Sequence, residues 1–251
     1  MEVSYKGTGY AGFQIQKNAN SVQAEIEKAM GIYLREPVTL TGSSRTDTGV
    51  HAKQNYFHFD FDDLAKPDWD KAAYRLNAIL PPDIVIKQIK LVAPTAHCRF
   101  DARFRTYEYA IYQSKNPFLA DRCYYYPYQL NIEILNDAAS LLKSYQNFGA
   151  FSKRNTQVKS HECSLFESRW FKRDDVIIYK VSGNRFLRGM VRGLTGTMLK
   201  VGRGITSLHQ FRDIIEMKDP TKTDFSVPPQ GLMLIKVGYH SFEEHDCNEP
   251  E

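Results

Sequence analysis

The stretch TGSSRTDTGVHA, at residues 41–52, is the densest cluster of small and polar residues in the chain. A short β-prone run precedes it at residues 38–41, and phenylalanines alternate with polar residues after it at 57–61. Both patterns predict strands. Small residues let the backbone turn sharply and let a ligand come close. We therefore expect residues 42–52 to form a loop held between two rigid strands.

Hydrophobic spacing outward from this loop alternates between helical and strand character. The sequence predicts helices at 21–34, 69–80, 131–145, 186–201 and from 207 to before Pro220, and further strands at 84–91, 99–112, 176–181 and 232–237. Three helix starts carry capping residues: Asn20 with Gln23 as the return half of a capping box, Asn131, and Ser207 with Gln210.

This order of elements predicts an α+β fold of two similar α/β halves. We expect them at residues 1–96 and 97–245, followed by an acidic tail at 246–251. Their antiparallel sheets would form one continuous central sheet flanked by helices, with an active-site cleft between the halves. The first half would carry the loop around Asp47, and the second a strand with Tyr107 and a helix rich in arginine.

Charge is unevenly distributed along the chain of 251 residues, although its 33 Lys+Arg and 29 Asp+Glu give a net charge of only +4. Residues 95–205 contain 18 basic and 9 acidic residues, a local net charge of +9, and the remainder has a net charge of −5. A basic middle is expected of a protein that meets a polyanion. Solvated charged faces explain the pattern equally well.

The cysteines are scattered at positions 98, 123, 163 and 247, without the paired spacing of a zinc site. We therefore expect reduced thiols, a cytoplasmic protein and no bound metal. The first residues lack the basic and apolar regions of a signal peptide, and no run of 18 apolar residues occurs. These features argue against secretion and membrane insertion.

Asp47 is the candidate for chemistry in the 41–52 loop. A carboxylate between two threonines, with Arg45 two positions away, is suited to act as an ionised nucleophile or base. An Asp before a Gly is also typical of a plain turn. A glycosidase would need a second acid, but the acidic residues at 60–63 resemble a solvated face. We interpret His51 as a structural hydrogen-bonding residue.

Two further segments combine positive charge with other features of nucleic-acid binding. Residues 103–109 interleave basic and aromatic residues on a strand, which suits bases stacking on rings such as Tyr107. On the predicted helix at 186–201, Arg185, Arg188 and Arg192 would share one face, and glycines at 189, 193 and 196 indicate close backbone packing. A half-buried aromatic strand and a solvated basic helix face remain the alternatives.

Together, these segments resemble the tRNA pseudouridine synthase family whose bacterial members are called TruA. The likeness runs from about Tyr5 to Tyr239 through six motifs in order: YKGTGYAGFQ at 5–14, SVQ at 21–23, SRTDTGVHA at 44–52, FRTYEY at 104–109, FLRGMVR at 186–192 and PPQGL at 228–232. Family members usually have Gly at Ser44, Ala at Thr48 and Trp at Phe13. They also carry several residues ahead of Tyr5, so we expect either an upstream start or a short first strand.

The resemblance implies an isomerase that converts uridine to pseudouridine in the anticodon stem-loop of tRNA, without a cofactor or metal, as a homodimer. It implies that Asp47 is the catalytic aspartate, that Tyr107 packs against the target base, and that Arg45 and Arg192 lie in the pocket. The remaining basic residues would then hold tRNA phosphates: Arg185, Arg188, Lys153, Arg154 and Lys159.

Two other functions stay open on the residues alone. A non-catalytic protein that binds structured RNA would need the basic and aromatic residues but not Asp47. A nucleoside or glycoside hydrolase would use Asp47 together with a second acid.

Overall fold

The structure is a computed structural model that describes residues 1–61, 68–154 and 158–240. The chain forms two compact units: Met1–Arg103 together with the chain from Leu234 onward, and Phe104–Met233. The described residues contain five α-helices and mostly antiparallel strands, which confirms the expected mixed fold with antiparallel sheets and flanking helices. No described helix is long and apolar enough to cross a membrane.

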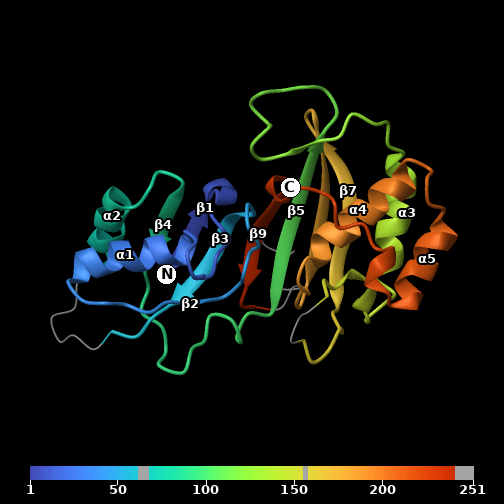
Figure 1. The fold of residues 1–251 in the computed structure, drawn as a ribbon. Helices are drawn as coiled ribbons and strands as arrows, with labels where there is room; N and C mark the ends of the chain where they lie inside the picture. The colour runs from blue at the N-terminus through green and yellow to red at the C-terminus, as the bar shows by residue number, and fades with distance from the viewer. Residues whose placement is uncertain (62–67, 155–157, 241–251) are drawn as a thin grey trace. The chain divides into compact units, whose positions relative to one another are not determined.

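The first unit is an antiparallel sheet with two helices. Its elements are β1 (Glu2–Tyr5), the 3-10 turn η1 (Gly7–Gly9), α1 (Val22–Leu34), β2 (Thr41–Gly42), β3 (His51–His58), α2 (Trp69–Ile79), β4 (Ile84–Gln88) and, from Leu234, β9 (Leu232–Gly238). β1 is hydrogen-bonded to β3 on one side and β4 on the other, and β2 pairs with the end of β3. In Figure 1, α2 lies beside β4 with α1 next to it.

The start of α1 differs from the prediction by one residue. Ser21, not Asn20, is the N-cap, and its Oγ accepts a hydrogen bond from the backbone N of Ala24 at 3.3 Å. Gln23 is not the return half of a capping box, because its Nε2 donates to the carbonyl oxygen of Leu40 at 2.9 Å. Asn and Ser are equally good caps, so the local sequence could not choose between neighbouring positions.

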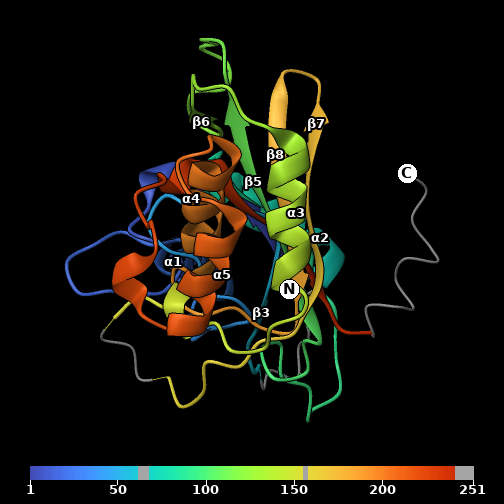
Figure 2. The same ribbon diagram turned by 90° about the vertical axis from the view of Figure 1, so that its right-hand side faces the viewer.

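The second unit is a sheet with three helices. Its elements are β5 (Phe104–Tyr112), β6 (Tyr124–Tyr125), α3 (Ile132–Leu142), η2 (Gly149–Phe151), β7 (Leu165–Arg173), β8 (Val176–Gly183), α4 (Met190–Gly202), α5 (Leu208–Met217), η3 (Pro220–Lys222) and η4 (Pro229–Gly231). β8 lies between β5 and β7 and is antiparallel to both, whereas β6 runs parallel to the end of β5. Figure 2 shows the three helices against one face of this sheet.

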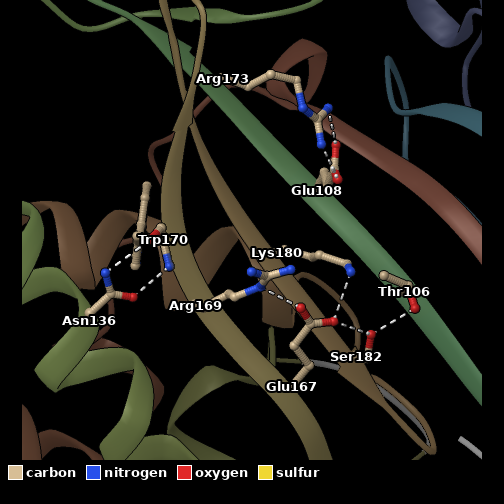
Figure 3. Close-up of polar contacts among 9 residues, drawn as sticks. All are labelled: Thr106, Glu108, Asn136, Glu167, Arg169, Trp170, Arg173, Lys180 and Ser182. Carbon is tan, nitrogen blue, oxygen red and sulfur yellow. Dashed lines mark hydrogen bonds and ion pairs between the residues drawn. The ribbon is translucent and has the colours of Figure 1, made fainter. Parts of the chain in front are cut away.

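Two of the expected helix caps in this unit are confirmed. The side chain of Asn131 accepts a hydrogen bond at the start of α3, and Ser207 and Gln210 form a complete capping box at the start of α5. Asn136 then fixes α3 to the sheet, since its amide bonds both the N and the O of Trp170 at 2.8 and 2.9 Å (Figure 3). Residues of β7 that alternate with Trp170 point to the opposite side of the sheet from its side chain. Two of them form an ion pair, with Arg169 Nε 2.7 Å from Glu167 Oε1.

Several boundaries expected from the sequence are wrong. Helix α4 begins at Met190 rather than at 186, because Gly189 has a left-handed φ of 74° that interrupts the helix before it. The strand expected through 57–61 ends at His58, and the run at 38–41 contributes only to the two-residue β2. Strand β7 was not predicted, although its pairing with β8 supplies the outer part of this sheet.

Candidate active site

Asp47 lies on a turn between β2 and β3 in the first unit, which we call the Asp47 turn (residues 43–50). Both ends of this turn are hydrogen-bonded to neighbouring chain. The backbone N of Ser43 donates to the carbonyl of Tyr56 at 2.8 Å, and that of Gly49 donates to the carbonyl of Tyr10 at 3.4 Å. The loop expected between two strands is therefore present, and its backbone is fixed at both ends.

Two glycines bring the chain before α1 against the Asp47 turn, Gly12 at its middle and Gly7 at its end. Gly12 has a φ of +103°, and a Cβ built on it would lie 3.0 Å from the carbonyl oxygen of Thr46. That oxygen also accepts a hydrogen bond from the backbone N of Phe13 at 3.1 Å. A Cβ on Gly7 would overlap the carbonyl oxygen of Val50. Only glycine allows this approach at both positions.

The side chains of the Asp47 turn divide between interior and solvent. Arg45 and Thr48 are exposed, Asp47 is half-buried, and Thr46 is buried at 8% exposure. A half-buried carboxylate is accessible to a ligand while its backbone is held. This combination suits a nucleophile, which must be both reachable and fixed.

The sequence interpretation missed a buried chain of polar side chains beneath this turn. Asn55, on β3, donates from Nδ2 to the carbonyl of Ser44 at 2.9 Å and to Tyr5 Oη at 3.2 Å. Tyr5 Oη lies 2.8 Å from Thr46 Oγ1. Asn55 falls in the same strand phase as buried Phe57, and a polar residue in the buried phase was the available signal.

His51 is placed as expected of a structural residue. It is 2% exposed, and its Nδ1 accepts a hydrogen bond from the backbone N of Gly7 at 3.0 Å. This bond joins the first residue of β3 to η1, so His51 contributes to holding the chain that packs on the Asp47 turn.

In the second unit, Tyr107 lies on β5 opposite Val181 and is only 9% exposed. Its ring meets the ring of Phe186 edge to face, with centroids 5.1 Å apart and planes at 83°. Edge-to-face contact between aromatic rings is favourable, so Phe186 helps to hold the orientation of the Tyr107 ring.

Arg192 is on the first turn of α4 and is half-buried. Its Nε donates to the carbonyl of Val227 at 2.8 Å, and its Nη2 donates to the carbonyl of Phe225 at 3.4 Å. Tyr109 holds the same loop, because its hydroxyl donates to the carbonyl of Pro228 at 2.7 Å. Burial raises the pKa of Tyr109, so this hydroxyl stays protonated as the donor.

The predicted close packing of another backbone on the α4 glycines is confirmed. A Cβ on Gly196 would overlap the carbonyl oxygen of Asp224, and one on Gly193 would lie 2.8 Å from the ring of Phe225. The glycines therefore let residues 223–227 approach α4, where Arg192 binds their carbonyl groups.

The predicted arginine stripe on one helix face is wrong. Arg185 and Arg188 are exposed but precede α4, in the segment 184–189 that we call the arginine segment. A backbone bond from Lys153 N to Arg188 O at 3.0 Å fixes this segment. Gly189 is also tight against Lys153, whose Cγ would lie 2.9 Å from an added Cβ. Arg188 and Lys153 are therefore neighbours through tertiary contact.

The other predicted basic residues lie near this point in the chain. Arg154 is exposed, with its Nη2 4.0 Å from Asp219 Oδ1, and Lys159 is exposed. Residues 155–157, between Arg154 and Lys159, lie outside the described residues. Arg45 and Asp47 belong to the first unit, and the remaining candidates belong to the second.

Among the described residues, no group of three or more His, Cys, Asp or Glu residues is placed to hold a metal ion.

Comparison with known proteins gives consistent matches. A family model described as tRNA pseudouridine synthase matches residues 138–240. A protein named tRNA pseudouridine synthase A from Parabacteroides distasonis is 41% identical over 237 residues, covering 94% of each chain. Proteins of the same name from Bacteroides thetaiotaomicron and Porphyromonas gingivalis are 41% and 40% identical, over 94% and 95% of this chain and 88% and 96% of theirs.

Proposed function

The chain belongs to the tRNA pseudouridine synthase family, and we propose that it isomerises uridine to pseudouridine in tRNA with Asp47 as its nucleophile. The observation that carries the proposal is the identity of 41% along 94% of both chains. Within that length, Asp47 is a half-buried carboxylate on a turn whose backbone is fixed at both ends. The chain is thus an isomerase that acts on tRNA.

The reaction rearranges bonds without loss of a group. The N1–C1′ bond breaks, the uracil turns, and a C5–C1′ bond forms, while a proton leaves C5 and one is gained at N1. Atoms and electrons balance within the nucleotide and water, so the proposed reaction requires no metal or redox cofactor. Asp47 attacks either C1′ of the ribose or the uracil ring, and in both cases the uracil turns while the attacked half is bonded to the enzyme. The bond to Asp47 breaks again as the product is completed, which restores the free carboxylate.

The remaining pocket roles follow from the chemistry of the side chains. The target uridine must leave its stack to meet Asp47. We assign Tyr107 to stacking on the uracil and Arg45 to filling the vacated space, which fits the exposed position of Arg45. We also assign Arg192 to the uridine pocket, as the family resemblance implies.

We further propose that tRNA phosphates are held by Arg185, Arg188, Lys153, Arg154 and Lys159, with the anticodon stem-loop as the target. The backbone bond between Lys153 and Arg188 supports a shared phosphate site, because it joins two residues whose cationic side chains can both contact the tRNA backbone.

The larger arrangement is proposed on the family resemblance. Halves at 1–96 and 97–245 would share a continuous sheet and enclose the cleft, and two chains would form a homodimer in the cytoplasm. Sedimentation of the protein with and without tRNA tests the dimer, because a single monomer bound to tRNA would contradict it.

A tRNA transcript labelled with tritium at uridine C5 tests the function directly. We expect the protein to release tritium while the RNA chain stays intact. Release of free uracil would indicate a hydrolase instead, and tRNA binding without either product would indicate a binding protein.

The nucleophile is tested with Asp47→Asn, which keeps the shape of the side chain but removes its charge. Turnover should fall at least about 1,000-fold, as expected when a covalent nucleophile is lost. The affinity for tRNA should change little. Asp60→Asn is the matched control, since Asp60 is an exposed carboxylate of the same unit, and it should keep wild-type turnover. A fully active Asp47→Asn enzyme would refute the assignment.

A further inference from the structure

We propose that Tyr5, Thr46 and Asn55 form a buried tether that positions Asp47 for attack. The inference rests on the proposed function, because it gives these residues a role only if Asp47 is the nucleophile. None of the three would touch the substrate, so each is a positioning residue. The tether lies wholly within the first unit and is built from side chains of β1, the Asp47 turn and β3.

Asn55 is the fixed end of the tether. It is 0% exposed, and its amide makes three hydrogen bonds: from Nδ2 to Ser44 O at 2.9 Å and to Tyr5 Oη at 3.2 Å, and at Oδ1 from the backbone N of Tyr56 at 2.9 Å. Rotating the amide by half a turn would set its NH2 against the N–H of Tyr56 and its oxygen against the carbonyl of Ser44. Only one orientation satisfies all the partners.

Tyr5 carries the connection to the residue before the nucleophile. Its hydroxyl accepts a hydrogen from Asn55, so its own hydrogen is available for Thr46 Oγ1, 2.8 Å away. Tyr5 is 4% exposed. The β1–β3 register shifts between Val3 and Tyr5, and such bulges re-aim the side chains that follow them. The irregular pairing at the end of β1 therefore occurs at Tyr5, whose side chain reaches the Asp47 turn.

The tether adds a side-chain link to the middle of the turn, where the backbone bonds Phe13 N to Thr46 O and Val50 N to Asp47 O already lie. The bonds of Ser43 and Gly49 fix its ends, whereas Thr46, next to Asp47, is held through its side chain from inside and by the N–H of Phe13. Because the network is shielded from water, a broken link cannot be replaced by solvent without rearrangement. A displacement of about 1 Å at a reacting group can cost about 100-fold in rate.

The test removes single hydroxyl groups from the tether. Tyr5→Phe and Thr46→Val should each lower kcat for tritium release about 10-fold to 100-fold, with KM for tRNA unchanged. Thr46→Ser, which keeps the hydroxyl, should restore most of kcat. The double variant should lose little more than either single one, because both remove the same link.

Tyr179→Phe is the matched control. Tyr179 is also fully buried, and its hydroxyl lies 3.0 Å from another hydroxyl, Ser168 Oγ, but it belongs to the second unit. It should lower the melting temperature without lowering kcat. Should Tyr5→Phe fail to fold, the pair Thr46→Val and Thr46→Ser decides the question.

Two results would overturn the tether: unchanged kcat in folded Thr46→Val, or a loss of kcat in Tyr179→Phe as large as in Tyr5→Phe. Failure of the proposed function has a different signature, since Asp47→Asn would then retain turnover. An inactive Asp47→Asn enzyme together with a fully active Thr46→Val enzyme would refute the positioning role of the tether and would still support Asp47 as the nucleophile.

Discussion

The Asp47 turn and the arginine segment both carry proposed functional side chains on irregular chain, but they are held in different ways. The Asp47 turn is fixed from inside, through buried side chains, and by backbone bonds at its ends. In the arginine segment the backbone is fixed by the Lys153–Arg188 bond and by Gly189, while the two arginine side chains, Arg185 and Arg188, are exposed to solvent.

This difference matches the demands of the two proposed roles. The attacking atom of a nucleophile must be positioned to within a fraction of an ångström of its reactive geometry, so a fixed position of the preceding residue favours the reaction. Attraction to phosphate falls gradually with distance, and a long arginine side chain can find its partner after the RNA arrives. Changes in the turn should therefore act on kcat, and changes in the arginine segment on affinity.

Among the variants that compare the two regions, Gly12→Ala is expected to have the largest effect. The φ of +103° at Gly12 is costly for alanine, and the new Cβ would lie within 3.4 Å of backbone atoms of Thr46, Asp47 and Thr48. We expect a loss of about 1–3 kcal/mol in the free energy of unfolding. Turnover should fall by about 100-fold or more, because the turn must shift. Chemical denaturation and tritium release measure the two effects.

Gly204→Ala separates the effect of backbone strain at a left-handed glycine from the effect of displacing the Asp47 turn. Gly204 has a φ of +72°, also in the left-handed region, but a Cβ on it would meet no atom within 4 Å. This variant should lose stability while keeping its kcat. Equal kcat in the two alanine variants would show that the Asp47 turn tolerates movement, and the comparison between the two regions would then break down.

Features determined by neighbouring residues could be predicted from the sequence. The capping side chains of Asn131 and Ser207 act within the first turn of their own helices, so their spacing alone identified them. The glycines of α4 also indicated close packing, because their repeated cost to a helix needs a compensating contact.

Features determined by distant contacts could not be predicted. Arg185, Arg188 and Arg192 fit a helical spacing, but the bond from Lys153 to Arg188 and the left-handed Gly189 hold the first two outside α4. The partners of Asn55 come from two other parts of the chain, residues 5 and 44. The alternation of residues along β3 indicated that Asn55 is buried, but no sequence pattern indicated its hydrogen-bond partners.

Arg188→Ala should have a smaller effect than Gly12→Ala, and on binding. No ion pair engages Arg188 among the described residues, so its charge is available to a phosphate. Its loss should weaken tRNA binding several-fold and reduce the slope of log K against log salt by about 1. The rate at saturating tRNA should stay near that of the wild type. An unchanged salt slope would exclude Arg188 from the tRNA contact.

The smallest effect is expected from Arg169→Ala, the control for Arg188→Ala in the same unit. Both arginines are exposed, but Arg169 lies 2.7 Å from Glu167 Oε1, and Glu167 also pairs with Lys180 at 3.1 Å (Figure 3). A surface ion pair contributes about 0–1 kcal/mol to stability, and the Glu167 carboxylate competes with a phosphate for the Arg169 guanidinium. Its removal should leave both tRNA affinity and the salt slope unchanged, as filter binding at several salt concentrations would measure. If Arg169→Ala weakened binding as much as Arg188→Ala, total charge rather than the arginine segment would determine tRNA affinity.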